Sequence, residues 1–130
     1  MKVRLSASGC DLDLMANDDG WCRCVLDCGN GVRDLGADTV SVVVERLWNL
    51  LTSTTARTPA GTIDGLTVFS VLGLYEEHHW LYASANETSL ILFWQDARSS
   101  PPSTICRMTL SPPDQQAWIT ALQSLSEATS

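Results

Sequence analysis

Residues 61–110 read GTIDGLTVFSVLGLYEEHHWLYASANETSLILFWQDARSSPPSTICRMTL, and this stretch decides the fold. It contains four short runs rich in leucine, β-branched and aromatic residues, and such runs separated by polar turns predict four consecutive strands. The apolar residues of the runs are Leu66, Val68, Val71 and Leu72, then residues 80–83, then residues 90–94, then Ile105, Met108 and Leu110. Most runs are apolar at both odd and even positions, so both faces of this sheet need cover.

The residues before this stretch predict another sheet, which has one solvated face. Apolar and polar side chains alternate along residues 3–7 and 11–14, as expected of strands with one face towards water. Further strands are predicted at residues 21–28 and 32–35. The turns between these strands fall at Ser8-Gly9, at residues 17–20 and at Asn30-Gly31, where Asn, Asp and Gly tolerate the backbone angles of tight hairpins.

Two helices are predicted, one after each group of strands. The first covers residues 38–52, with Asp38 as its N-cap and apolar residues at helical spacing. Those apolar residues are Val40, Val43, Val44, Leu47, Trp48 and Leu51. The second begins at Ser111-Pro112-Pro113-Asp114, which combines an N-cap serine, prolines in the first turn and a capping acid. It continues through Trp118, Ala121, Leu122 and Leu125 to about Ser126.

The expected fold class is therefore α+β, with two antiparallel four-stranded sheets and two long helices in the order ββββα-ββββα. A chain of 130 residues is the length of one domain. We expect a single domain over residues 1–130, built from sub-units 1–53 and 61–126 that a polar linker at residues 52–60 joins.

Charge restricts the classes of partner. The formal net charge is −7, and Lys2 is the one lysine of the chain. Nucleic acids and anionic lipids are bound mainly through Lys and Arg, so this composition disfavours both, although a well-solvated surface explains the same charge. No apolar run approaches the ~20 residues of a membrane span, and the N-terminus resembles no signal peptide. We expect a cytoplasmic protein that does not enter membranes.

The five cysteines are expected to be reduced thiols, as is usual for a protein without an export signal. Cys10, Cys22, Cys24 and Cys28 suggest zinc, because thiolates are its usual ligands. In an extended strand, however, Cys24 and Cys28 would lie ~13 Å apart, too far to share one ion without a bulge. Buried core cysteines are the alternative, and we expect no metal and no cofactor.

Glu76-Glu77-His78-His79 is the other cluster with possible chemistry. Adjacent strand residues face opposite ways, so one histidine is expected to be wet and the other partly buried. A helical zinc motif needs two histidines four residues apart, and the chain has none. No nucleophile motif accompanies the cluster, although Cys106 or a serine remains an option for catalysis. We therefore expect that the protein is not an enzyme, and we assign no catalytic residue.

The chain resembles two known families of proteins. Four strands and a helix, repeated twice, resemble the Whirly-type single-stranded nucleic-acid-binding fold over the whole chain, in element order alone. That resemblance implies opposed sheets and associating chains. Separately, Trp21, Trp80, Tyr82 and Trp94 are strand aromatics of the kind that stack unpaired bases, although strand aromatics are more often core and base stacking also needs a basic groove. Residues 111–125 resemble the closing helix of pleckstrin-homology domains, but the turn at residues 8–11 has no Lys or Arg for a phosphoinositide.

Three functions follow, in order of preference. The first is a non-enzymatic cytosolic protein that acts through protein contacts as a regulator or adaptor. The alternative is a single-stranded nucleic-acid-binding protein of Whirly-like build. The third is a small enzyme or ligand-binding protein.

The sequence also predicts a homodimer. One sheet and two helices can cover one face of the sheet at residues 66–110 fully and the other only in part, and exposed apolar surface usually marks an interface. The candidate interface residues are Val68, Trp80, Tyr82, Leu92 and Trp94, with Trp80 or Trp94 near the centre because buried aromatics anchor interfaces. Light scattering at micromolar concentration is expected to give twice the 14.2 kDa of one chain. A mass of one chain would mean that the sheet finds its cover within the chain.

Overall fold

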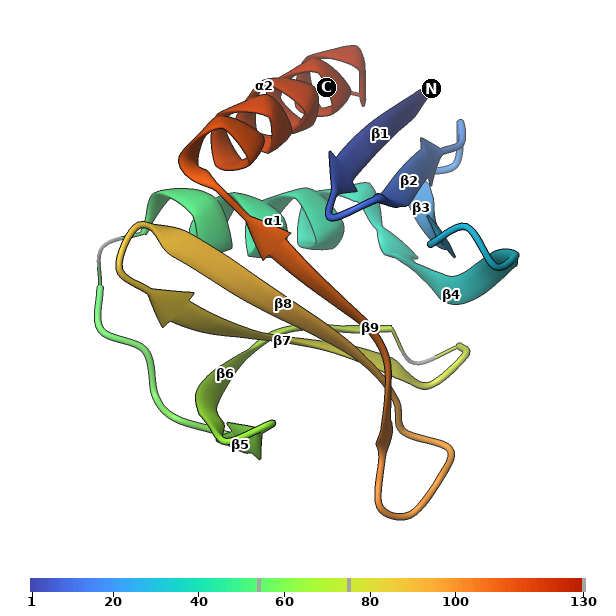
Figure 1. The fold of residues 1–130 in the computed structure, drawn as a ribbon. Coiled ribbons are helices and arrows are strands. Elements are labelled where there is room, and N and C mark those ends of the chain that lie inside the picture. The colour runs from blue at the N-terminus through green and yellow to red at the C-terminus, as the bar shows by residue number, and fades with distance from the viewer. Residues whose placement is uncertain (54, 75, 130) are drawn as a thin grey trace.

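The computed structural model describes residues 1–53, 55–74 and 76–129 and contains two antiparallel sheets, each followed by a helix (Figure 1). The first sheet has the order β1-β2-β3-β4 and the second the order β5-β6-β7-β8-β9, so both are meanders. The strands of the first sheet are β1 (Lys2–Ala7), β2 (Cys10–Ala16), β3 (Trp21–Asp27) and β4 (Val32–Thr39). Helix α1 (Val40–Thr52) follows. The second sheet comprises β5 (Gly61–Ile63), β6 (Leu66–Leu74), β7 (His79–Asn86), β8 (Ser89–Asp96) and β9 (Ser103–Leu110), and α2 (Pro112–Thr129) ends the order.

The expected α+β class is confirmed, with one strand added. Strand β5 pairs with β6 through a two-residue turn at Asp64 and Gly65, both of which have positive φ. Asp-Gly between short β segments is the residue pair that a type I′ hairpin prefers. The second sheet therefore has five strands where the sequence analysis expected four.

The first sheet has the expected solvated face. Its inner face carries leucines, cysteines and Ala7, whereas its outer face carries pairs of opposite charge. Arg4 and Asp13 face each other in register on β1 and β2, and the Arg4 Nε to Asp13 Oδ1 distance is 2.8 Å. Strand β4 is longer than expected, because Gly36 at φ 109° and a bulge between Cys24 and Val25 carry pairing on to Thr39.

Helix α1 begins two residues later than the sequence suggested. Thr39, not Asp38, is the N-cap, and its hydroxyl accepts from the backbone N–H of Val42. The Asp38 side chain instead accepts from the backbone N–H of Thr39, at 2.7 Å. Both residue types favour N-caps, so their preference alone does not separate two adjacent candidates.

One continuous core joins both sheets and both helices. It contains Trp94 from the second sheet, Trp118 from α2, Leu47 from α1 and Leu14 from the first sheet, all at most 1% exposed. Figure 1 shows α1 between α2 and the second sheet, with the first sheet beside both helices. Helix α2 packs against β1, and the Trp118 Nε1–H donates to the Ser6 carbonyl at 3.1 Å.

The outer face of the second sheet is covered by its own edge. Val68, Ile91 and Phe93 form a second, smaller cluster, against which Ile63, Leu66 and Tyr82 pack. The Arg107 guanidinium lies over the Phe93 ring, 5.5 Å from its centroid. An arginine stem can shield an aromatic face while its charged end stays in water. The chain thus supplies cover for a face that the sequence pattern left open.

Helix α2 starts with the expected capping box and ends three residues later than expected, at Thr129. The Ser111 hydroxyl accepts from the Asp114 backbone N–H at 3.4 Å, and the Asp114 carboxylate accepts from the Ser111 backbone N–H at 3.2 Å. Each side chain satisfies a backbone donor that the first turn leaves without a helical partner.

Replacing Ser111 by alanine removes one half of this box. We expect Ser111→Ala to lower the unfolding free energy by about 0.5–2 kcal/mol, measured from urea midpoints. Ser124→Ala is the matched control, because Ser124 lies exposed within α2, where alanine is a good helix former. Equal stability of the two variants would contradict the capping role.

Candidate functional site

The five candidate interface residues are not an exposed patch. Leu92 and Trp94 are 0% exposed and Val68 is 2% exposed, whereas Trp80 and Tyr82 are half-buried. Leu92 and Trp94 point into the core that both sheets share, so Trp94 cannot anchor a contact with a second chain as proposed. Dimer formation itself stays a prediction, with Trp80 and Tyr82 as the residues of the five that reach the surface.

An open groove of about 900 Å³ lies beside the two helices. Its apolar lining comes from α1, from the last turns of α2 and from the end of β2. The residues concerned are Ala16, Val40, Val44, Trp48 and Leu122. The backbone N–H of Val40 donates to the Gly20 carbonyl at 2.9 Å, which fixes the start of α1 beside the β2–β3 turn.

Acidic side chains surround this groove. Asp18, Glu45 and Glu127 are exposed and line it, and no Lys or Arg side chain lies among the residues that line the described groove. Trp21, which is 47% exposed, directly follows Gly20 of the lining. Met1 also lines the groove, and its N-terminal ammonium donates to the Ala16 carbonyl at 3.1 Å. The groove therefore combines apolar side chains with three carboxylates and one ammonium group.

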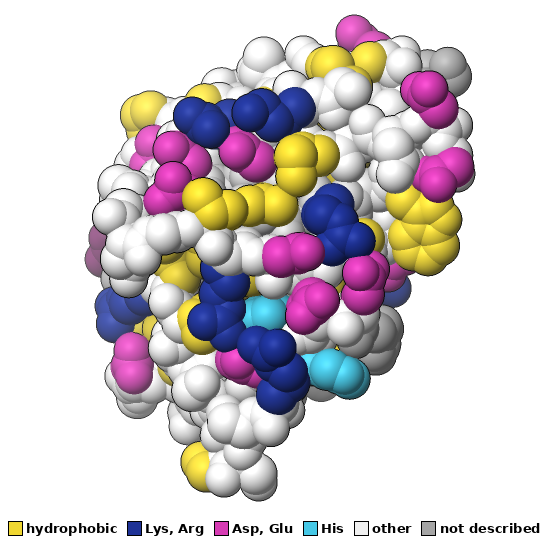
Figure 2. All heavy atoms as spheres, turned by 90° about the vertical axis from the view of Figure 1, so that its right-hand side faces the viewer, with side chains coloured by type: hydrophobic (Ala, Val, Ile, Leu, Met, Phe, Trp, Pro, Cys, Tyr) yellow, Lys and Arg dark blue, Asp and Glu magenta, His cyan; other side chains and the backbone are white. Residues whose placement is uncertain are grey.

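A network of ion pairs runs across the face of the molecule where β4 meets the β6–β7 turn. Figure 2 shows arginine and acidic side chains intermingled on this face, next to histidine. Arg33 donates to Asp96 at 2.7 Å and, through Nε, to His79 Nε2 at 3.1 Å. Gly36 allows this approach, because a Cβ there would lie 3.2 Å from the Glu77 backbone nitrogen.

The hydrogen bond from Arg33 determines the tautomer of neutral His79. His79 Nε2 accepts the hydrogen bond from the Arg33 Nε–H, so neutral His79 carries its own proton on Nδ1. His79 is 1% exposed, and burial, followed by the positive charge of Arg33, lowers its pKa. The hydrogen bonds from Arg98 hold the pKa of Asp96 well below its usual range.

His79 and Asp96 are joined through the Arg33 side chain in one part-buried hydrogen-bonded network. The expectation of one wet and one sheltered histidine is met, since His78 is exposed and His79 buried. Within residues 1–53, 55–74 and 76–129, Arg33 is the side chain that hydrogen-bonds to His79, and no serine, threonine or cysteine does so.

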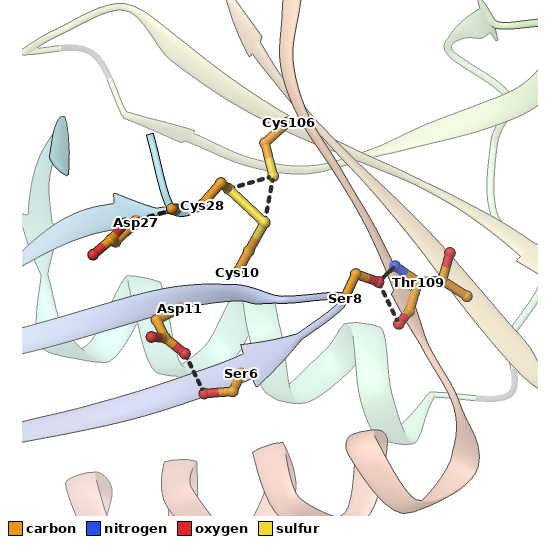
Figure 3. The surroundings of a disulfide bond; sticks show 9 residues. Ser6, Ser8, Cys10, Asp11, Asp27, Cys28, Cys106 and Thr109 are labelled. Carbon is orange, nitrogen blue, oxygen red and sulfur yellow. Dashed lines mark hydrogen bonds between the residues drawn. A yellow bond between two sulfur atoms is a disulfide. The ribbon is translucent and has the colours of Figure 1, made fainter. Parts of the chain in front are cut away.

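The cysteines are grouped differently from the expected set. Cys10 and Cys28 form a disulfide, so the expectation of five reduced thiols is wrong for these two (Figure 3). Cys106 of β9 joins them, with its Sγ 3.1 Å from Cys28 Sγ and 3.5 Å from Cys10 Sγ. Burial raises the pKa of the Cys106 thiol.

Cys22 and Cys24 lie outside this group. Both are free, 0% exposed and part of the shared core. The pairing of Cys10 with Cys28 was within reach of the sequence, because Asp11 faces Asp27 in register, Cys10 directly precedes Asp11 and Cys28 directly follows Asp27. The arrival of Cys106 from the other sheet had no sequence signal.

Comparison with protein families, with curated proteins and with solved structures finds no match to this chain. No helix in the described part of the chain is long and apolar enough to cross a membrane. The function therefore has to be argued from the residues themselves.

The buried histidine makes stability depend on pH. Unfolded His79 has a pKa near ~6.5 and the folded residue a lower one, so the unfolded chain binds more protons as pH falls below ~6.5. The unfolding free energy should fall from pH 7 to pH 5, with His79 contributing at most about 1.4 kcal/mol per pH unit. Urea unfolding of wild type and His79→Gln at both pH values isolates this contribution.

His78→Gln is the matched control, because His78 precedes His79 but is exposed. The His79 variant should lose less stability on acidification than wild type, and the His78 variant as much as wild type. The same acid dependence in all three proteins would rule out His79 as the titrating group.

Proposed function

We propose that this is a non-enzymatic protein that acts through protein contacts, and that the groove beside α1 and α2 binds a basic, amphipathic segment of a partner protein. The observation that carries the proposal is an apolar groove lined by three carboxylates and by no Lys or Arg side chain among its described residues. In this proposal, the groove is the binding surface of the regulator or adaptor expected from the sequence.

The shape of the groove favours the binding of one side of a helix, or of an extended segment. A volume of about 900 Å³ accommodates several side chains, and the groove is open to solvent rather than enclosed. Val44 and Trp48 lie four residues apart on α1, so they form one continuous apolar stripe. Amphipathic helices bind in such grooves through apolar residues at matching spacing.

Charge determines which segment fits. Asp18 on the β2–β3 turn, Glu45 on α1 and Glu127 on α2 border the groove from three elements. A segment that carries Lys or Arg beside its apolar residues meets complementary charge there, and the net charge of −7 attracts it over a longer range. A nucleic acid or an anionic membrane would be repelled from the same surface.

The single-stranded nucleic-acid alternative receives less support. A base-stacking surface requires aromatic rings that face solvent. Trp94 and Phe93 are 0% exposed, and a Cβ on Gly73 would overlap the Trp80 ring, which shows how closely that ring lies against its own sheet. Trp21, at 47% exposed, directly follows Gly20, which lines the acidic groove.

A designed peptide tests the groove directly. An 18-residue amphipathic helix of leucine and lysine, labelled with a fluorophore, should bind the protein, and its leucine–glutamate counterpart should not. Glu45→Lys should raise the Kd of the lysine peptide about fivefold, equivalent to about 1 kcal/mol for one reversed contact. Fluorescence anisotropy at low and high salt measures both effects.

The matched control is Glu87→Lys, which changes the net charge equally but lies at the β7–β8 turn, outside the groove. It should change the Kd much less than Glu45→Lys. Equal weakening by both variants, or no binding of the lysine peptide, would contradict the groove assignment. Submicromolar, salt-sensitive binding of a labelled single-stranded oligonucleotide would favour the alternative function.

A further inference from the structure

We propose that Cys10, Cys28 and Cys106, once the Cys10–Cys28 disulfide is reduced, form a three-thiolate site for a zinc ion. The fourth position would be held by water. This site is separate from the groove and does not depend on the proposed function.

Three sulfur atoms from two different sheets converge at this point. Cys10 begins β2, Cys28 follows β3, and Cys106 projects from β9 towards both of them (Figure 3). All three Sγ atoms lie within 4.8 Å of one another. Tetrahedral zinc with bonds of ~2.3 Å places its thiolates about 3.8 Å apart, so the reduced sulfurs need to move little to surround an ion.

The rigid surroundings hold the three side chains on one centre. The Ser8 hydroxyl accepts from the Thr109 backbone N–H at 2.8 Å and donates to the Thr109 carbonyl at 3.3 Å. These bonds tie the β1–β2 turn, two residues before Cys10, to β9, three residues after Cys106 (Figure 3). The distance between the two sheets is therefore set independently of the sulfur atoms.

The location differs from that of ordinary core cysteines. Cys22 and Cys24 are fully buried in β3, and no third histidine, cysteine or carboxylate among the described residues forms a group with them. In the trio, Cys10 and Cys106 are buried, but Cys28 is part-exposed. An ion can enter on the Cys28 side, and a water ligand can remain in contact with solvent there.

Net charge selects zinc among the ions that thiolates prefer. Soft thiolate ligands favour Zn²⁺ and Cu⁺. Three thiolates leave a net charge of −1 with Zn²⁺ and −2 with Cu⁺. Uncompensated charge is costly to bury. Among the described residues, two chain neighbours of the trio form ion pairs: Asp11 pairs with Arg4, and Arg107 pairs with Asp64.

Formation of the site requires a reductant that opens the Cys10–Cys28 disulfide. Two molecules of a monothiol of the glutathione class reduce the Cys10–Cys28 disulfide to two thiols and leave as their own disulfide. Zinc then displaces three protons from the three thiols and binds three thiolates. A link within the first sheet is thereby replaced by one that joins both sheets through Cys106.

Zinc titration of the reduced, desalted protein under anaerobic conditions tests the site. Competition with a chromophoric chelator should show one Zn²⁺ per wild-type chain, and oxidised wild type should bind none. Cys106→Ala should weaken binding by roughly 100-fold or more, because one of three protein ligands is lost. Cys22→Ala, a buried thiol outside the trio, should bind zinc as wild type does.

Circular dichroism establishes that each variant is folded, and Cys28→Ala at the part-exposed position replaces Cys106→Ala if the latter does not fold. Absence of stoichiometric zinc from reduced wild type would overturn the proposal. So would unchanged binding by the trio variant, or equal loss in Cys22→Ala. A parallel Cu⁺ titration that fills the site while Zn²⁺ does not would overturn the choice of zinc.

Discussion

The fold depends on the attachment of β9 and α2 to the first sheet. Trp118 of α2 is buried against β1 and donates its indole N–H to the Ser6 carbonyl, while Ser8 is bonded to the Thr109 backbone on β9. These contacts join residues more than 100 positions apart. Each sheet alone would leave one apolar face in water, and residues of β9 and α2 complete the core that the two sheets share.

This attachment also explains why the chemically interesting groups are non-local. Cys106 reaches Cys28 from 78 positions away, and Arg33 reaches Asp96 from 63 positions away. Both contacts cross from the first sheet to the second. Short-range spacing carries no information about such contacts, because they follow from how two finished sheets are placed against each other.

Much of the architecture was nevertheless predictable. Period-two and helical patterns located both sheets and both helices, since each pattern reflects burial of one face within a single element. The Asp64-Gly65 turn was visible in the sequence and was overlooked, and a register argument from Asp11 and Asp27 would have paired Cys10 with Cys28. The burial of His79 beside Arg33 was beyond reach, because it depends on Gly36 letting the β6–β7 turn approach β4.

The second sheet shows why an apolar pattern on both faces does not by itself require a partner chain. A face can be covered by a helix layer, by a second molecule, or by the edge of its own sheet together with long polar side chains. Here Ile63 and Leu66 of the β5–β6 hairpin pack on Val68, Ile91 and Phe93, and Arg107 covers the Phe93 ring. On α1, Val44 and Trp48 pack on the main core with one side and line the groove with the other, and the proposed basic partner segment would cover that second side.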